Sequence, residues 1–248
     1  MTAKAHPLLI SLLTVWLVTP ALGQAQSAPR GQLEVNGGYQ LGTKNFKSSG
    51  TIRANAEDGS YSTDHQLTSG VMLNLAGGYA VWKQLGLGLG IAKFSSTTAS
   101  TFNGSVPHPF FFNKPRTVSG SVSGLSRDEM AIHIQARFVA PVTPRLQVLV
   151  FGGPSFVQVK QGLVSGFSWK DEYPYDQATL VSTQTASGRA SALGFHAGGD
   201  VAFFFGPRVG VGGSVQVSGA TLKLTAGNAQ ATINAGGVQA GGGLRVRF

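Results

Sequence analysis

Apolar residues recur at every second position in eight stretches of this chain. The stretches cover residues 32–41, 71–81, 85–92, 132–140, 145–157, 193–204, 209–217 and 238–248. In the first of them, Leu33 and Val35 share one face, whereas Glu34 lies on the opposite, polar face. Alternation of period two predicts β-strands with two unlike faces. Stretch 145–157 is the weakest, because both its faces are largely apolar and Pro154 cannot donate to a strand ladder, so we expect pairing to bulge or end there.

The connections between these stretches alternate in length. Tight turns are expected at 82–84, 141–144 and 206–208, and long polar segments at 43–66, 95–128, 158–191 and 219–234. Long outer loops and short periplasmic turns are typical of bacterial outer-membrane barrels. The pattern therefore predicts an all-β fold, an eight-stranded antiparallel up-and-down transmembrane β-barrel with long extracellular loops and short periplasmic turns.

A soluble secreted barrel or sandwich would show the same alternation. In that case the bulky face would fill the core, whereas in a membrane barrel it faces lipid and the small polar face lines the lumen. Aromatic residues at expected strand ends, Tyr79, Trp82 and Phe203, and the terminal Phe248 favour the membrane.

The N-terminus has the features of an export signal. Lys4 precedes an apolar run, Leu8 to Val18, and small residues follow that suit cleavage after Gly23 or Ala25. The apolar run is well short of the ~20 residues that a spanning helix needs. We therefore predict a cleaved signal peptide over residues 1–25, a barrel domain over residues 26–248, and location in the bacterial outer membrane.

Two stretches carry a resemblance to a known class of protein. The hairpin from Gly194 to Gly213 and the closing "GLRVRF" resemble the small bacterial outer-membrane β-barrels of the broad OmpA, OmpX and OmpW type, especially the barrel-only outer membrane protein beta-barrel families. In such proteins a last strand with alternate apolar residues and a final Phe is the signal read by the barrel-assembly machinery. The resemblance implies that role for Leu244, Val246 and Phe248, and implies that machinery as a partner.

Few charges fall on the face expected to line the lumen. We predict that they form an ion-pair network whose members are Glu34, Arg137, Asp200, Arg245 and Arg247. Because the first and last strands must meet if the barrel closes, we expect Glu34 to pair with Arg245 or Arg247 across that seam. His133 and His196 share this face, where packing is a commoner role for histidine than metal binding.

No known catalytic or cofactor motif is present. The chain lacks a G-x-S-x-G elbow, and its glycine runs lack the spacing of a dinucleotide-binding turn. With no cysteine, thiolate metal sites and disulfides are unavailable. We therefore predict no enzyme activity, no catalytic, cofactor-binding or metal residues, and no cofactor.

The chain has a formal net charge of +9, and export argues against nucleic acid as the partner. Most cations fall in or beside the long segments. They are Lys44, Lys47, Arg53, Lys93, Lys114, Arg116, Arg127, Lys160, Lys170 and Arg189. A basic outer ring of this kind could attract outer-membrane lipid and lipopolysaccharide phosphates, or it could be an ordinary solvated surface.

Aromatic residues gather in two of the long segments, at Val106 to Pro115 within 95–128 and at Phe167 to Gln177 within 158–191. They could contact an extracellular ligand or fold over the barrel mouth, and we favour the second. The predicted function is a structural or surface-interaction role in the cell envelope. The alternatives are a narrow passage for ions or small apolar molecules, as in OmpW-like barrels, and, less favoured, an adhesin or a barrel enzyme.

Overall fold

The computed structural model describes residues 30–41 and 45–248, so the predicted signal peptide, residues 1–25, lies outside the described residues. Its strands are β1 (Gly31–Gln40), β2 (Phe46–Ala54), β3 (Glu57–Leu67), β4 (Gly70–Trp82), β5 (Leu85–Val106), β6 (Arg116–Pro141), β7 (Leu146–Glu172), β8 (Gln177–Phe204), β9 (Val209–Ala226) and β10 (Ala229–Arg247). None of the described residues forms a helix long and apolar enough to cross a membrane.

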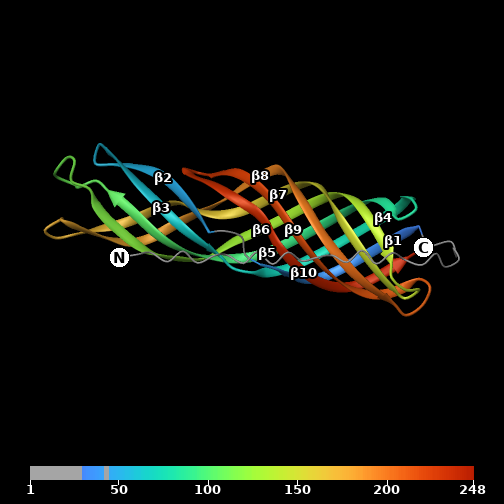
Figure 1. The fold of residues 1–248 in the computed structure, drawn as a ribbon. Helices are drawn as coiled ribbons and strands as arrows, with labels where there is room; N and C mark the ends of the chain where they lie inside the picture. Colours follow the sequence, from blue (N-terminus) through green and yellow to red (C-terminus); the bar gives the residue numbers. More distant parts are fainter. Residues whose placement is uncertain (1–29, 42–44) are drawn as a thin grey trace, which may run out of the picture.

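Eight of these strands close into a ring (Figure 1). β1 pairs with β4, the pairing continues through β5 to β10 in chain order, and β10 returns to β1 from Gln32↔Arg247 to Gln40↔Gln239. Every pairing is antiparallel, and closure leaves no free sheet edge around this part of the wall. The predicted eight-stranded up-and-down barrel is confirmed, with its tight turns between β4 and β5, β6 and β7, and β8 and β9.

The long polar segments are β-hairpins rather than irregular loops. Segment 43–66 contains β2 and most of β3, which pair with each other and then with β10 and β5 respectively. The other three segments continue β5 to β10 far beyond the roughly ten residues that a tilted strand needs to cross a membrane. We call the part of the barrel built from β2, β3 and these distal strand portions the extension.

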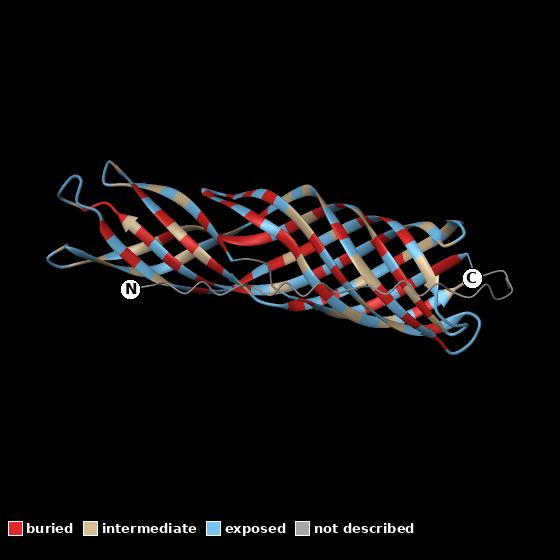
Figure 2. Cartoon of the chain, in the orientation of Figure 1, coloured by how far each residue is buried: buried red, intermediate tan, exposed pale blue. Residues whose placement is uncertain are grey.

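The polarity of the wall inverts along the barrel axis. Near the tight turns, Val215 and Val217 of β9 are exposed while Gln216 between them is buried; farther along the same strand, Leu224 is buried and Lys223 is exposed. Burial alternates along the strands throughout (Figure 2), so the chemistry changes while the alternation persists. We call the part of the barrel that carries the tight turns between β4 and β5, β6 and β7, and β8 and β9 the turn half. Side chains that face outward are apolar in the turn half and polar in the extension.

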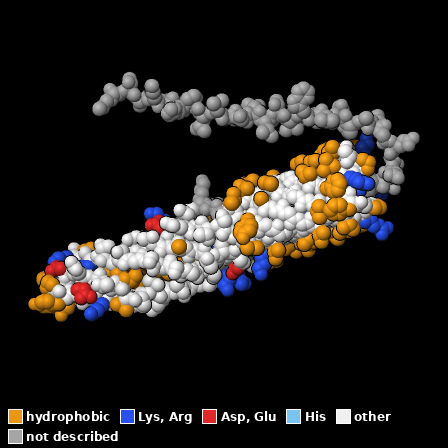
Figure 3. All heavy atoms as spheres, turned by 90° about the horizontal axis from the view of Figure 1, so that it is seen from below, with side chains coloured by type: hydrophobic (Ala, Val, Ile, Leu, Met, Phe, Trp, Pro, Cys, Tyr) orange, Lys and Arg blue, Asp and Glu red, His pale blue; other side chains and the backbone are white. Residues whose placement is uncertain are grey.

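Most of the exposed apolar side chains form a band around the turn half, which we call the apolar belt. Members include Leu33, Val35, Leu73, Leu75, Leu87, Leu89, Ile132, Ile134, Phe156, Leu193, Phe195, Val215, Val217, Val238 and Leu244. Figure 3 shows this gathering of hydrophobic side chains over one half of the molecule, with charged groups at its border and near the far end.

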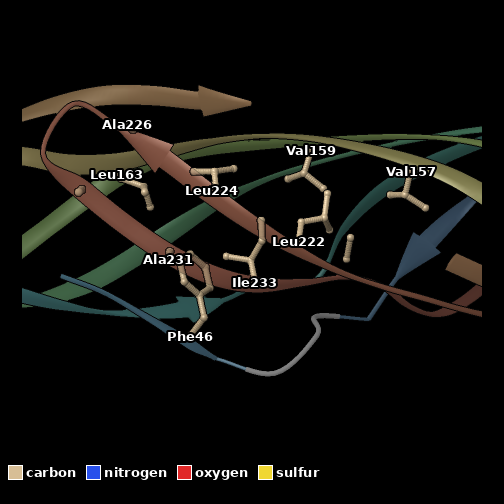
Figure 4. Packing of buried hydrophobic residues seen from close by; sticks show 11 residues of the cluster. Phe46, Val157, Val159, Leu163, Leu222, Leu224, Ala226, Ala231 and Ile233 are labelled. Atoms are coloured by element: carbon tan, nitrogen blue, oxygen red, sulfur yellow. The ribbon is translucent and has the colours of Figure 1, made fainter. Parts of the chain in front are cut away.

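Inside the extension the core is apolar and packed. One cluster lies between β7, β9 and β10 with Phe46 of β2 (Figure 4). A second joins Tyr61, Phe102 and Phe167, whose rings contact one another, to Leu125 and to valines of β5, β6 and β7. The extension is therefore built like a water-soluble β protein, with apolar clusters inside and a Ser- and Thr-rich outer surface.

The weakest predicted strand is present as part of β7. β6 and β7 pair at His133↔Ser155 and again at Ala136↔Gly152, and no pairing joins them across Gly153 and Pro154. The register is the same on both sides of this gap, and β8 stays paired with β7 throughout it, at Pro154↔Phe195. The expected interruption at Pro154 is thus confined to one edge of the strand.

Candidate functional site

The lumen of the turn half contains two buried ion pairs. Arg137 of β6 donates from Nη2 to Oε1 of Glu34 on β1. Arg245 of β10 donates from Nε to both carboxylate oxygens of Asp200 on β8, at 3.1 and 3.2 Å, and its Nη2 is also paired with Asp200. All four side chains are buried, with at most 3% of any residue exposed.

The prediction that Glu34 forms an ion pair with Arg245 or Arg247 across the seam between β1 and β10 is wrong. Glu34 and Arg245 lie directly opposite each other on β1 and β10, but Arg245 reaches Asp200, two strands away. Glu34 is paired with Arg137 of β6 instead.

Glycines on the intervening strands give the arginines their path. A Cβ added at Gly78 of β4 or Gly88 of β5 would lie 2.5 or 2.6 Å from Cδ of Arg137, and one added at Gly212 of β9 would lie 2.9 Å from Nε of Arg245. Each arginine side chain therefore passes over glycine positions of the neighbouring strands to reach its carboxylate. The glycine-rich faces seen in the sequence are part of this site, because they set which charges can meet.

Arg247 lies apart from the network. Its guanidinium donates to the carbonyl oxygens of Pro207 at 2.9 Å and Pro144 at 3.2 Å, and stacks 3.8 Å from the centre of the Phe204 ring. These contacts join the turns at the rim of the barrel. Of the five residues predicted to form one network, the structure brings four together in the lumen and places Arg247 at its end.

Amide side chains fill the lumen on both sides of the ion pairs. Below them, Gln147 donates to Gln32, which donates to Glu34 at 3.0 Å. Above them, Gln216 donates to Gln239 at 3.2 Å and Gln239 donates to Gln40 at 2.6 Å. The spaces left between these groups measure about 10 Å³ each, room for one water molecule at most.

His133 and His196 share a serine. Nδ1 of His133 lies 2.8 Å from Oγ of Ser155, and Nδ1 of His196 lies 2.9 Å from the same oxygen. The two rings are 4.3 Å apart between centroids, and all three residues are buried. Among the described residues no group of three or more His, Cys, Asp and Glu side chains is placed to hold a metal ion.

A third buried ion pair lies where the lumen meets the extension. Arg127 donates from Nε to Glu129 at 2.7 Å and from Nη2 to the carbonyl oxygen of Asn234 at 2.5 Å. Glu129 also accepts the backbone N–H of Gly236 at 2.8 Å, so the pair joins β6 to β10 across the barrel. Sequence reasoning missed this pair by assigning Arg127 to a loop, although the alternation around it continues that of β6.

The predicted basic ring loses two members. Arg127 and Arg116 face the interior, where Arg116 pairs with Asp171 at 2.8 Å and donates to the carbonyl oxygen of Pro107 at 2.9 Å. Lys44 lies outside the described residues. The remaining members, Lys47, Arg53, Lys93, Lys114, Lys160, Lys170 and Arg189, are exposed.

The aromatic residues of the distal hairpins divide between core and surface. Phe167 is buried in the second cluster with Trp169 packed against it, whereas Phe110, Phe111 and Phe112 are exposed at the tip between β5 and β6. Lys114 bonds Asp176 at 2.5 Å and so ties this tip to the one between β7 and β8. The hydrogen bond and charge of Lys114 lower the pKa of the Asp176 carboxyl.

A scan against protein-family models found no match, and no curated protein matches the chain. Among solved structures, it is similar to the outer membrane protein OprG from Pseudomonas aeruginosa, with 11% identity and a TM-score of 0.48 over 91% of this chain and 99% of that one. It is also similar to Neisserial surface protein A, with 10% identity and a TM-score of 0.40 over 88% and 97%. For Ail of Yersinia pestis, in complex with sucrose octasulfate, the values are 12% and 0.35 over 87% and 99%. The fold assignment rests on the strand pairing of the chain itself.

Proposed function

We propose that this chain is an integral β-barrel of a bacterial outer membrane, with a structural or surface-interaction role and a lumen closed to ions. The apolar belt supports the membrane placement. On β6 and β9, and on β1 with the residue that follows it, the outward apolar positions run over residues 130–138, 209–217 and 33–41, roughly the nine to eleven residues of a tilted membrane strand. Exposing such a band to water would be costly, whereas lipid solvates it.

The proposed orientation places the tight turns on the periplasmic side and the extension outside the cell. This assignment follows the usual asymmetry of outer-membrane barrels, in which the periplasmic connections are short. It also places the polar outer surface of the extension in water, where its Ser and Thr side chains are solvated. The extension would then stand outside the membrane as a rigid body with its own apolar core.

The closed lumen is the observation that supports a non-conducting role. Ion pairs to Glu34 and Asp200 cross the lumen at one level, and the amide groups fill it above and below. A cavity of about 120 Å³ opens at the turn end, and Arg137 lies at its inner boundary. An eight-stranded barrel is narrow enough for side chains to fill it in this way.

The proposed role is not enzymatic. The contact of Ser155 with two histidines is the arrangement nearest to a nucleophile and its base, but all three groups are buried within the lumen at the level of the apolar belt. A substrate would have to displace packed side chains to reach the serine oxygen. We therefore assign these residues to packing and hydrogen bonding between β6, β7 and β8.

Planar-bilayer recording tests the closed lumen. We expect the refolded chain to insert, as judged by heat-modifiable gel mobility, yet to give no stable unitary currents. Stable currents from the unaltered chain, with ion selectivity that changes on Arg137→Gln, would instead support the narrow passage. A matched control is Arg208→Gln, which removes one exposed cation at the turn end without touching the lumen.

A surface-interaction role would depend on the exposed tips, for which an extracellular ligand is proposed within segments 95–128 and 158–191. Replacing Phe110, Phe111 and Phe112 together by Ser removes the exposed rings while keeping the contacts of Arg116 that order the tip. We expect this variant to keep its barrel and to lose binding to cells or matrix. Binding equal to that of the unaltered chain would leave a structural role alone.

A further inference from the structure

Four outward-facing side chains form a row across β5 to β8, just beyond the apolar belt. The strand register places Ser95 opposite Asp128, Asp128 opposite Lys160, and Lys160 opposite Arg189. Ser95 donates from Oγ to Oδ1 of Asp128 at 2.7 Å. We call this set the basic row.

Two cations of the basic row face each other, and Asp128, which lies opposite Lys160 on its other side, accepts a hydrogen bond from Ser95 and forms no ion pair with Lys160. Lys160 and Arg189 are both exposed, and like charges directly opposite each other on neighbouring strands are destabilising. Neither is within ion-pair distance of a carboxylate in the part of the chain that the structure describes. By contrast, Lys47 in the extension is paired with its cross-strand neighbour Asp64 at 3.2 Å. An anion between the two side chains would relieve their repulsion.

The surface next to the basic row changes in two steps. Two residues along each strand toward the turns, the register aligns Lys93, Met130, Gln158 and Ser191. Gln158 therefore adjoins Lys160 on β7, and Ser191 adjoins Arg189 on β8. Two residues farther along each strand, Ile132, Phe156 and Leu193 lie side by side on three neighbouring strands, and all three are exposed. Each step is about 7 Å along the strand. Figure 3 shows Lys and Arg side chains at the border of the hydrophobic band.

We infer that the basic row binds a phosphorylated membrane glycolipid of the lipopolysaccharide class. Its phosphate lies between Lys160 and Arg189, where two charge-assisted bonds are available. Its sugar lies over Gln158 and Ser191, and its acyl chains lie against the apolar belt, whose three neighbouring strands are wide enough for several chains. Lys93, in the second row, is placed for a further phosphate of the same headgroup.

This inference rests on the proposed outer-membrane placement and narrows the expected basic ring to one face of the barrel. A glycolipid fits better than a phospholipid with a single phosphate, because Gln158 and Ser191 separate the two cations from the apolar side chains on the same two strands. A phospholipid phosphate joins its acyl chains through glycerol alone. The two sources of phosphate can therefore be separated by experiment.

The test uses the folded full chain in detergent, titrated with diphosphoryl lipid A, with dephosphorylated lipid A and with phosphatidylglycerol, and read by native mass spectrometry. The variant is Lys160→Gln with Arg189→Gln. Its control, Arg53→Gln with Lys170→Gln, removes two exposed cations of the extension that lie away from the belt. We expect the variant to bind diphosphoryl lipid A roughly tenfold or more weakly than the unaltered chain, and the control to bind as the unaltered chain does.

Three results would overturn the inference. They are equal binding by the variant and the unaltered chain, equal binding of the phosphorylated and dephosphorylated lipids, and phosphatidylglycerol binding as tight as that of lipid A with the same loss in the variant. Heat-modifiable mobility of every variant shows that the barrel is intact. A chain that inserts into bilayers but gives any of these results contradicts this site alone, whereas a chain that never inserts contradicts the proposed function.

Discussion

At the residue scale, glycines that line the lumen determine which charged side chains can pair. Arg245 could meet Glu34 on the adjacent strand, yet it crosses Gly212 to reach Asp200. Arg137 crosses two glycine-bearing strands to reach Glu34. Desolvating a charge is expensive, so each buried arginine needs a carboxylate within hydrogen-bond reach, and the glycines provide the route.

A double-mutant cycle tests this pairing. Asp200→Asn leaves the Arg245 guanidinium buried without its counter-charge, and we expect a loss of about 3–5 kcal/mol in the free energy of unfolding. Adding Arg245→Gln should restore part of that loss, giving a coupling of about 1–3 kcal/mol. The measurement is urea unfolding of the barrel in lipid vesicles. The matched cycle of Glu34→Gln with Arg245→Gln should give a smaller coupling, and the reverse order would contradict the assigned pairs.

The sequence predicts which way these side chains face but not which of them meet. Because strand alternation fixes parity, the inward positions of Glu34, Arg137, Asp200 and Arg245 follow from the apolar pattern of their strands. Partners depend on the curvature of the closed wall and on which neighbouring positions are empty, and neither is visible along one strand. Arg247 has the same parity and still lies outside the network, because it is at the rim.

At the element scale, the distal hairpins are the part that sequence reasoning described least well. A search for bulky apolar residues on alternate positions stops where the outer face becomes Ser and Thr, as at Ser95 on β5. Beyond that point the same positions still face inward, but the apolar residues now occupy the inward positions, as Phe102 and Val106 do. The segments predicted as loops are therefore strands, and Arg116 and Arg127 within them are buried.

The hairpin of β2 and β3 is held by a buried histidine. His65 lies between Ser48 and Ser100, 2.9 Å from each hydroxyl, and stacks on Phe46 at 4.3 Å. Burial lowers the pKa of His65 from 6.5 to about 4, with Asp64 raising it and Arg127 lowering it to smaller extents.

Because an opened hairpin exposes a histidine of ordinary pKa, it binds more protons than the closed one between pH 6.5 and about 4. The contribution of His65 is therefore full above pH 6.5 and is lost as the pH falls toward 4. We expect faster amide exchange over residues 46–67 at pH 5 than at pH 7, after correction for intrinsic rates. His65→Gln should remove this difference, and an unchanged difference in that variant would assign it to another group.

The seam between β1 and β10 depends on backbone contact. A Cβ at Gly243 would lie 1.8 Å from the carbonyl oxygen of Val35, whereas a Cβ at Gly37 would meet nothing within 4 Å. We expect Gly243→Ala to reduce the yield of closed barrel severely and Gly37→Ala to refold like the unaltered chain. The fraction of heat-modifiable protein after refolding into detergent measures both, and equal yields would place the tight contact elsewhere.

At the scale of the whole molecule, the same strands form two parts of the wall that differ in their outward-facing side chains. In the turn half the wall is apolar outside and polar inside, and in the extension this is reversed. The reversal occurs near the basic row, so the proposed boundary between lipid and water coincides with a change in side-chain chemistry while the hydrogen-bonded wall continues through it. The membrane placement proposed above depends on this reversal.

The last residue has both a structural and a proposed assembly role. Phe248 exchanges two backbone hydrogen bonds with Gly31, at 2.8 and 2.9 Å, while most of its ring is exposed. Phe248→Ala keeps those bonds, so we expect nearly normal refolding in detergent. The proposed assembly signal of Leu244, Val246 and Phe248 predicts that the same variant is impaired in insertion in cells. Equal impairment in both settings would show a structural role only.

The most direct test of the account is outer-membrane fractionation of the expressed chain combined with gel mobility before and after heating. The closed ring of eight strands and the apolar belt predict that the chain is recovered with the outer membrane and migrates faster unheated than heated, because the barrel stays compact in detergent. Recovery in the soluble periplasmic fraction with the same mobility in both conditions would contradict a membrane barrel.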